Sequence, residues 1–151
     1  MSDDLELGLC VTAFLFDAMM SVMAAEGDVD PRTEEFLYRT ISPALMKASG
    51  FLDPSGSTSP LYAVALEQGR RRLASELPPG HGGGLCRRLW SMAAVDGEVT
   101  EMEIATIRAY GAVVGVDAER NDELGVDVLT ELTARRQAIR VAASWKPAIA
   151  G

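Results

Sequence analysis

The chain has 151 residues, a length that one domain usually accommodates, and no disulfide framework is possible with only two cysteines. Hydrophobic residues make up 48% and charged residues 24%, values that exclude a largely disordered chain. The net charge of −8 argues against nucleic acid as a partner, because phosphate binding needs a basic face.

The first predicted element is a helix over residues 5–25, which contains the longest apolar stretch of the chain with Asp17 at its middle. Such a stretch is long enough to cross a bilayer, but a central carboxylate costs about 2.5–3.5 kcal/mol there. The residues before it carry acids and no Lys or Arg, which is opposite to a secretory signal. We therefore expect the central helix of a soluble core, no transmembrane segment and a cytoplasmic protein.

Further helices follow without any strand-like alternation bounded by hairpin turns. Asp30-Pro31 and Ser59-Pro60 each place a capping residue before a proline at the first helical position, which predicts a helix start. The predicted helices span 5–25, 31 onward with a break or kink at Pro43, 60–77, 85–95, 100–115 and 117–145, with loops at 50–59 and 78–84. The chain is thus predicted to be all-α: a single domain, 1–151, forming a compact bundle of about six to seven helices.

An internal repeat relates two parts of the chain at an offset of 70 residues. The repeat units, about 5–50 and 85–116, each contain a helix, an acid-Gly turn and a second capped helix. We expect the two helix-turn-helix units to bury their apolar stripes together. Four identical pairs carry the repeat: Ser21 and Ser91, Ala24 and Ala94, Gly27 and Gly97, Val29 and Val99.

Asp96 lies on the extension of an apolar helix stripe, at the end where the helix dipole disfavours a carboxylate by roughly 0.3–1 kcal/mol. Glu26 repeats this situation in the first unit. Partial burial would add to the cost, so something should compensate for it. Gly27 and Gly97 fit the left-handed residue that closes such a helix.

Three compensations remain open. The turn acids can cap the next helix, with Asp96 accepting from amides near 99–102 and with Thr100 and Glu103 forming a capping box. Alternatively, Asp96 can form an ion pair with Arg87, Arg88 or Arg108. Finally, a divalent cation (Ca²⁺, Mg²⁺ or Mn²⁺) can lie between Asp96 and Glu103, and between Glu26 and Glu34 or Glu35, because carboxylate oxygens favour hard ions.

The spacing does not fit an EF-hand. Asp96, Gly97 and Glu103 would fill positions 5, 6 and 12 of that loop, but positions 1 and 3 fall on Met92 and Ala94, which cannot ligate. The same frame puts Thr33 at position 12 of the first unit.

The remaining reactive residue types give weaker signals. His81, the only histidine, lies in the predicted 78–84 loop, and we expect it to be exposed to solvent. Cys10 and Cys86 lie among apolar residues, which indicates buried structural thiols. No nucleophile motif accompanies any of them.

The segments SVMAAEGDVDPRTEE and SMAAVDGEVTEMEIATIRAYGAVVGVDAE resemble the paired motifs of the tellurite-resistance TerB-like family. The family pattern is a small-residue helix, Asp-Gly-x-apolar, three residues, Glu and an apolar helix. The second segment matches it through Asp96, Gly97, Val99 and Glu103, whereas the first has Glu26 for the Asp and a distal Glu shifted to Glu34 or Glu35. The resemblance implies an all-helical domain with clustered acids proposed to bind metal, and a role in tellurite or wider stress and membrane-linked responses.

These observations favour a non-enzymatic stress-response protein that binds a divalent cation through Asp96, Glu103, Glu26 and Glu34. Its expected partners are other stress-response or membrane-associated proteins. The alternative is a protein-interaction module whose turn acids only cap helices. A hydrolase that uses the paired carboxylates is the third hypothesis.

Overall fold

The computed structural model describes residues 3–147 and confirms the predicted all-α fold. Seven helices and two short strands are present in this part of the chain. Their bounds are α1 Leu7–Ala24, α2 Pro31–Thr40, α3 Pro43–Ala48, α4 Pro60–Glu76, α5 His81–Ala93, β1 Glu98–Val99, α6 Glu101–Val113, α7 Ala118–Ala134 and β2 Arg140–Val141.

Several helices begin where the sequence predicts a cap. The Asp30 carboxylate accepts a hydrogen bond from the Arg32 amide at 2.8 Å, and α2 starts at Pro31. Helix α2 ends at Thr40, and α3 begins at Pro43. The Ser42 hydroxyl caps α3 by accepting a hydrogen bond from the Leu45 amide. The predicted break at Pro43 is therefore a new helix start, since a proline loses no hydrogen bond at the first helical position.

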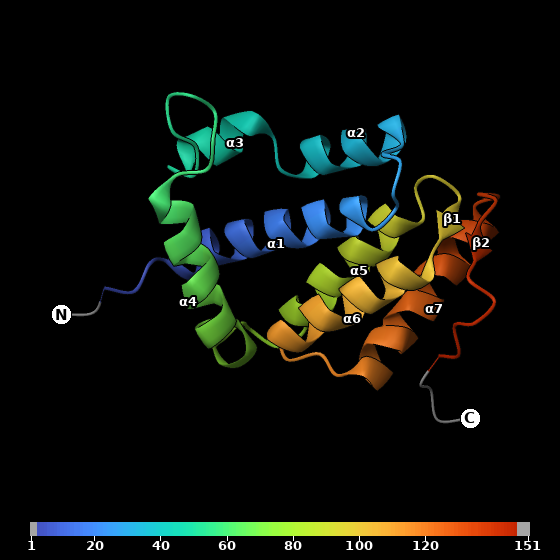
Figure 1. Cartoon of the computed structure of the whole chain (residues 1–151). Coiled ribbons are helices and arrows are strands. Elements are labelled where there is room, and N and C mark those ends of the chain that lie inside the picture. The colour runs from blue at the N-terminus through green and yellow to red at the C-terminus, as the bar shows by residue number, and fades with distance from the viewer. Residues whose placement is uncertain (1–2, 148–151) are drawn as a thin grey trace.

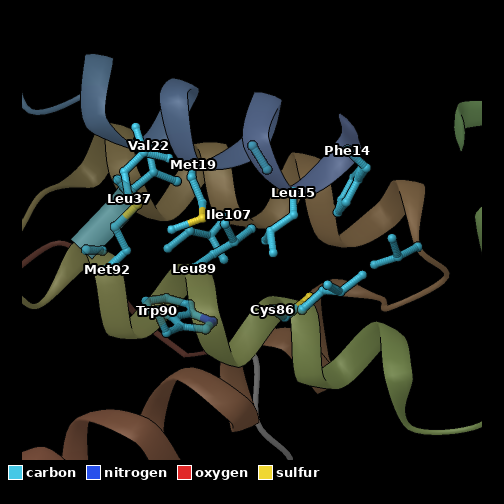
Figure 2. Close-up of a cluster of buried hydrophobic side chains, with 14 of the residues drawn as sticks. Phe14, Leu15, Met19, Val22, Leu37, Cys86, Leu89, Trp90, Met92 and Ile107 are labelled. Carbon is cyan, nitrogen blue, oxygen red and sulfur yellow. The ribbon is translucent and has the colours of Figure 1, made fainter. Parts of the chain in front are cut away.

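Helix α1 is the central element of the fold and contacts α2, α4, α5 and α6 (Figure 1). By length and composition alone it could cross a membrane. In the structure its buried side chains face those of α5, α6 and α2, and together they form the core (Figure 2). The labelled members of this core include Leu15, Met19, Val22, Leu37, Leu89, Trp90, Met92 and Ile107.

Asp17, the charged residue within α1, is half-buried and receives a hydrogen bond at 2.7 Å from the hydroxyl of Tyr110 on α6. The same tyrosine oxygen lies 2.7 Å from the Ser21 hydroxyl. This polar contact explains how a carboxylate is accommodated in an otherwise apolar helix, because hydrogen bonding offsets much of its desolvation. It also ties α1 to α6.

Helix α5 begins at His81, so the predicted loop over 78–84 and the predicted start at Leu85 are wrong in this detail. One glycine of this turn, Gly82, is required by close packing. A Cβ on Gly82 would lie 2.7 Å from the Val114 carbonyl oxygen, a distance that no side chain tolerates. Tertiary contact therefore overrides the low helix propensity of glycine here. His81 is exposed, as expected.

Helix α7 ends at Ala134, and the predicted continuation to Trp145 is wrong. Arg136 adopts a left-handed conformation with φ of 66°, and the Gln137 amide donates back to the Leu132 carbonyl at 3.1 Å. This is a Schellman-type helix end, although glycine usually occupies the left-handed position. We call residues 137–145, which follow this end, the strap.

The strap returns to the bundle, where β2 pairs with β1 in parallel (Figure 1). Glu98 lies opposite Arg140, and Val99 lies opposite Val141. The sequence gives no sign of these strands, because they are two residues long and far apart in the chain. They place the strap against the turn between α5 and α6.

Candidate functional site

Two turns of matching geometry connect the paired helices of the repeat. We call residues 25–30, between α1 and α2, the first elbow, and residues 95–100, between α5 and α6, the second elbow. Gly27 has a φ of 87° and Gly97 a φ of 86°, which confirms the predicted left-handed glycines. The amide of each glycine donates to the carbonyl three residues before it, at Ala24 or Ala94. The repeat is therefore visible in the local backbone.

The two elbows lie next to each other. Arg32, in the first turn of α2, forms an ion pair with Asp30 at 2.9 Å and donates a hydrogen bond to the backbone oxygen of Asp96 at 3.3 Å. Glu26 and Asp96 are also close enough to Glu103 for their negative charges to act on its pKa. The structure thus brings three of the four predicted ligands, Glu26, Asp96 and Glu103, into one region.

Glu103 is completely buried in the first turn of α6. Its Oε1 accepts from the Thr100 amide at 2.9 Å, while the Thr100 hydroxyl accepts from the Glu103 amide at 3.2 Å, so the predicted capping box is confirmed. Its Oε2 is buried and has no hydrogen-bond partner among the described residues. Burial, together with the charges of Glu26 and Asp96, raises the pKa of Glu103 to about 7.

Glu26 lies in the first elbow, two residues after the end of α1, and is half-buried. Its Oε1 accepts a hydrogen bond from the Thr33 hydroxyl at 3.0 Å. Its Oε2, like that of Glu103, is buried without a hydrogen-bond partner in the described part of the chain. Burial raises the pKa of Glu26, and the charge of Asp96 acts in the same direction.

Asp96 is half-buried, and its Oδ1 accepts from the Glu98 amide at 2.9 Å. The prediction that Asp96 accepts hydrogen bonds from amides near 99–102 is therefore wrong by one residue. The Asp96 carboxylate stabilises the turn and does not cap α6. The bond fixes the second elbow at the point where β1 begins.

The alternative of an ion pair between Asp96 and Arg87, Arg88 or Arg108 is also wrong, because no such pair forms among residues 3–147. The Arg108 guanidinium binds the buried Asp122 carboxylate at 2.6 Å. Arg87 pairs with Asp127 on α7 at 3.3 Å. Both contacts join neighbouring helices of the bundle, so these arginines stabilise packing.

Glu34 and Glu35 are exposed on α2, and Glu35 pairs with Arg39 at 2.8 Å. The structure does not bring Glu34 to the other acids. Thr33, which is completely buried, stands at the repeat position of Glu103 instead. The 70-residue offset of the repeat points to Thr33, because it aligns Thr33 with Glu103.

The thiols contribute little chemistry. Cys10 and Cys86 are buried, as expected, and burial raises the pKa of Cys86 to about 12. A thiol with such a pKa is protonated at neutral pH and is a poor nucleophile and metal ligand.

The chemistry of the site therefore centres on two carboxylates, each with one unsatisfied buried oxygen. Such an oxygen is stabilised either by a proton or by a cation. Across residues 3–147, no group of three or more His, Cys, Asp and Glu side chains is placed to hold a metal ion. The fit to a cation is thus partial: Glu26 and Glu103 offer oxygens, and Asp96, whose Oδ1 accepts from the Glu98 amide, would have to reorient in order to join them.

Comparisons of the chain with protein-family models, with curated proteins and with solved structures find no match. The resemblance to the TerB-like family accordingly rests on the two sequence motifs.

Proposed function

We propose that this protein is a non-enzymatic, TerB-like stress-response protein that binds a divalent cation weakly where its two elbows meet. One observation carries the proposal: the Oε2 atoms of Glu26 and Glu103 are buried and lack a hydrogen-bond partner among the described residues. Cytoplasmic location and stress-response or membrane-associated partners belong to the same proposal, and they rest on the sequence resemblance.

Carboxylate oxygens select hard cations such as Ca²⁺, Mg²⁺ or Mn²⁺. With Glu26, Glu103 and a reoriented Asp96 as protein ligands, water and backbone oxygens would complete the coordination. A site with so few protein ligands should bind with a Kd on the order of 10⁻⁴ to 10⁻³ M. Because ligating carboxylates must be ionised, the raised pKa of Glu103 predicts tighter binding at pH 8 than at pH 6.

The test is calorimetric titration of each cation at both pH values, with melting temperatures measured in parallel. Cation binding to the folded state should raise the melting temperature by mass action, and more at pH 8. Asp96→Asn combined with Glu103→Gln should abolish both signals. Glu34→Gln is the matched control, because Glu34 is exposed, and it should leave them unchanged. Absence of heat and of any shift at millimolar cation and pH 8 contradicts the proposal.

A second candidate is a protein-interaction module whose turn acids only cap helices. The capping box of Thr100 and Glu103 and the cap formed by Asp30 favour it. In that case no cation should change the melting temperature of the wild type. Glu103→Ala should still lower stability without any metal, whereas Glu103→Gln, which keeps the oxygen that accepts from Thr100, should not.

A further inference from the structure

The strap covers the outer side of the second elbow, and its hydrogen bonds run to that segment. The Gln137 side chain donates to the Ala94 carbonyl at 2.7 Å. The Arg140 amide donates to the Gly97 carbonyl at 2.7 Å, and the Ala142 amide donates to the Val99 carbonyl at 2.9 Å. The strap therefore pairs, as an extended chain, with the backbone edge of β1.

The covered surface has a recognisable chemical pattern. Val99 of β1 is completely buried beneath the pairing, while Glu98 is exposed. Farther along the strap, the Trp145 ring lies against Trp90 of α5, with ring centroids 5.1 Å apart. The surface beneath the strap thus provides a backbone edge for pairing, then an apolar side chain, and then an aromatic ring.

Charge complementarity adds to this pattern. The second elbow and the start of α6 carry Asp96, Glu98 and Glu101. The strap carries one charged residue, Arg140, which lies opposite Glu98, and it is flanked by Arg135, Arg136 and Lys146 with no acid among residues 135–146. The strap and its flanks are therefore complementary in charge to the acidic edge.

The local backbone preference of the strap does not favour its extended path. Its strand pairing is two residues long, and its path begins at Arg136, whose φ of 66° suits glycine better than arginine. The residues from 135 to 145 are good helix formers, so their extended path depends on contacts with the elbow rather than on local preference. A competing segment could accordingly replace the strap.

We propose that the β1 edge is a docking site for an extended, basic segment of a partner protein, and that the strap occupies it in cis until the partner binds. The partner segment pairs in parallel with β1, places a basic residue opposite Glu98 and an apolar residue opposite Val99, and packs an aromatic ring against Trp90. This mode is β-strand addition, in which backbone hydrogen bonds supply affinity and side-chain positions supply specificity. The proposal does not depend on cation binding.

A fluorescently labelled peptide with the sequence of residues 136–147, RQAIRVAASWKP, serves as the probe. Its binding to the full chain is measured by anisotropy. Ala142→Pro removes the amide that the strap donates to Val99, and it should raise the affinity for the peptide about tenfold by freeing the edge. Arg136→Gly favours the left-handed helix end, strengthens the strap in cis and should lower the affinity.

Two further variants keep the test decisive. Trp145→Ala also weakens the strap and replaces Ala142→Pro if that chain fails to fold. Glu98→Arg, at an exposed position, should weaken peptide binding in the freed chain by reversing the charge. Equal affinities in wild type, Ala142→Pro and Arg136→Gly, or equal binding of a scrambled peptide, overturn the proposal. A concentration-dependent dimer of the freed chain without peptide overturns the assignment to a partner protein, because it gives the edge to the strap of a second copy.

Discussion

The two elbows have the same backbone and opposite chemistry at one equivalent position. After the first elbow, Thr33 in the first turn of α2 is buried and donates a hydrogen bond to Glu26. After the second elbow, Glu103 in the first turn of α6 takes that position, accepts from the Thr100 amide and leaves its other oxygen without a partner among residues 3–147. A repeat thus preserves a fold while one buried side chain changes from a donor to an acceptor.

Each elbow nevertheless has one buried carboxylate oxygen without a hydrogen-bond partner among residues 3–147, on Glu26 at the first and on Glu103 at the second. The first elbow supplies a hydroxyl for one oxygen of its own acid, whereas the second adds a fully buried carboxylate close to two others. The second elbow is also the one that the strap covers. Making the elbows alike should therefore change stability in a predictable direction.

The largest effect is expected for Thr33→Glu, which gives the first elbow the acid of the second. It removes the donor to Glu26 and buries a further carboxylate near it, so the free energy of unfolding should fall by about 3 kcal/mol at pH 8. The loss should be smaller at pH 5, where the carboxyl groups hold protons. Urea denaturation at both pH values measures it. Glu34→Gln, one residue away and exposed, is the control, and a Thr33→Glu protein as stable as wild type at pH 8 would contradict the account.

The next effect is a pH dependence of the wild type. Folding raises the pKa of Glu103 from about 4.3 in the unfolded chain to about 7. Between these values the folded state binds more protons than the unfolded state, so stability should fall as pH rises from about 4.3 to 7. The raised pKa of Glu26 acts in the same direction.

Glu103→Gln should flatten this profile, because the amide has no proton to lose and keeps the oxygen that accepts from Thr100. The variant should match wild type near pH 5 and exceed its stability at pH 8. Denaturation curves across pH 4.5–8.5 measure both proteins. A wild-type profile that is already flat would show that Glu103 ionises as it does in water.

The smallest effect concerns the capping box, which only the second elbow has in full. Thr100→Ala removes the hydroxyl that accepts from the Glu103 amide, so the free energy of unfolding should fall by about 1 kcal/mol. Thr100→Ser keeps the hydroxyl and should lose much less. Thermal melts of both variants give the comparison, and equal losses would exclude the cap as the cause.

The parts of the fold that depend on local chemistry could be predicted from the sequence. Asp30-Pro31, Ser59-Pro60 and Thr100 mark helix starts because capping and proline geometry act within one turn. The start of α5 and the strap could not be predicted in this way. Gly82 is helical because two backbones approach closely, and the strap is extended because Arg140 and Val141 within it pair with Glu98 and Val99, far away in the chain.

The candidate site likewise has features that the sequence predicts and features that it does not. The sequence pairs Asp96 with Glu103 and Glu26 with Glu34 or Glu35, whereas the structure places Glu26 near Asp96 and Glu103 because the two elbows lie next to each other. Glu34 does not join them, because the residue equivalent to Glu103 at the 70-residue offset is Thr33 and Glu34 is exposed on α2. The bond from Asp96 to the Glu98 amide depends on the turn's own conformation, which periodicity does not reveal.

The contact between Trp90 and Trp145 has a practical consequence, because these are the only two tryptophans of the chain. Trp90 is buried in the core, whereas Trp145 belongs to the strap. Intrinsic emission therefore reports directly on whether that segment is docked, and a red shift or a loss of mutual quenching would register its departure in real time without any dye.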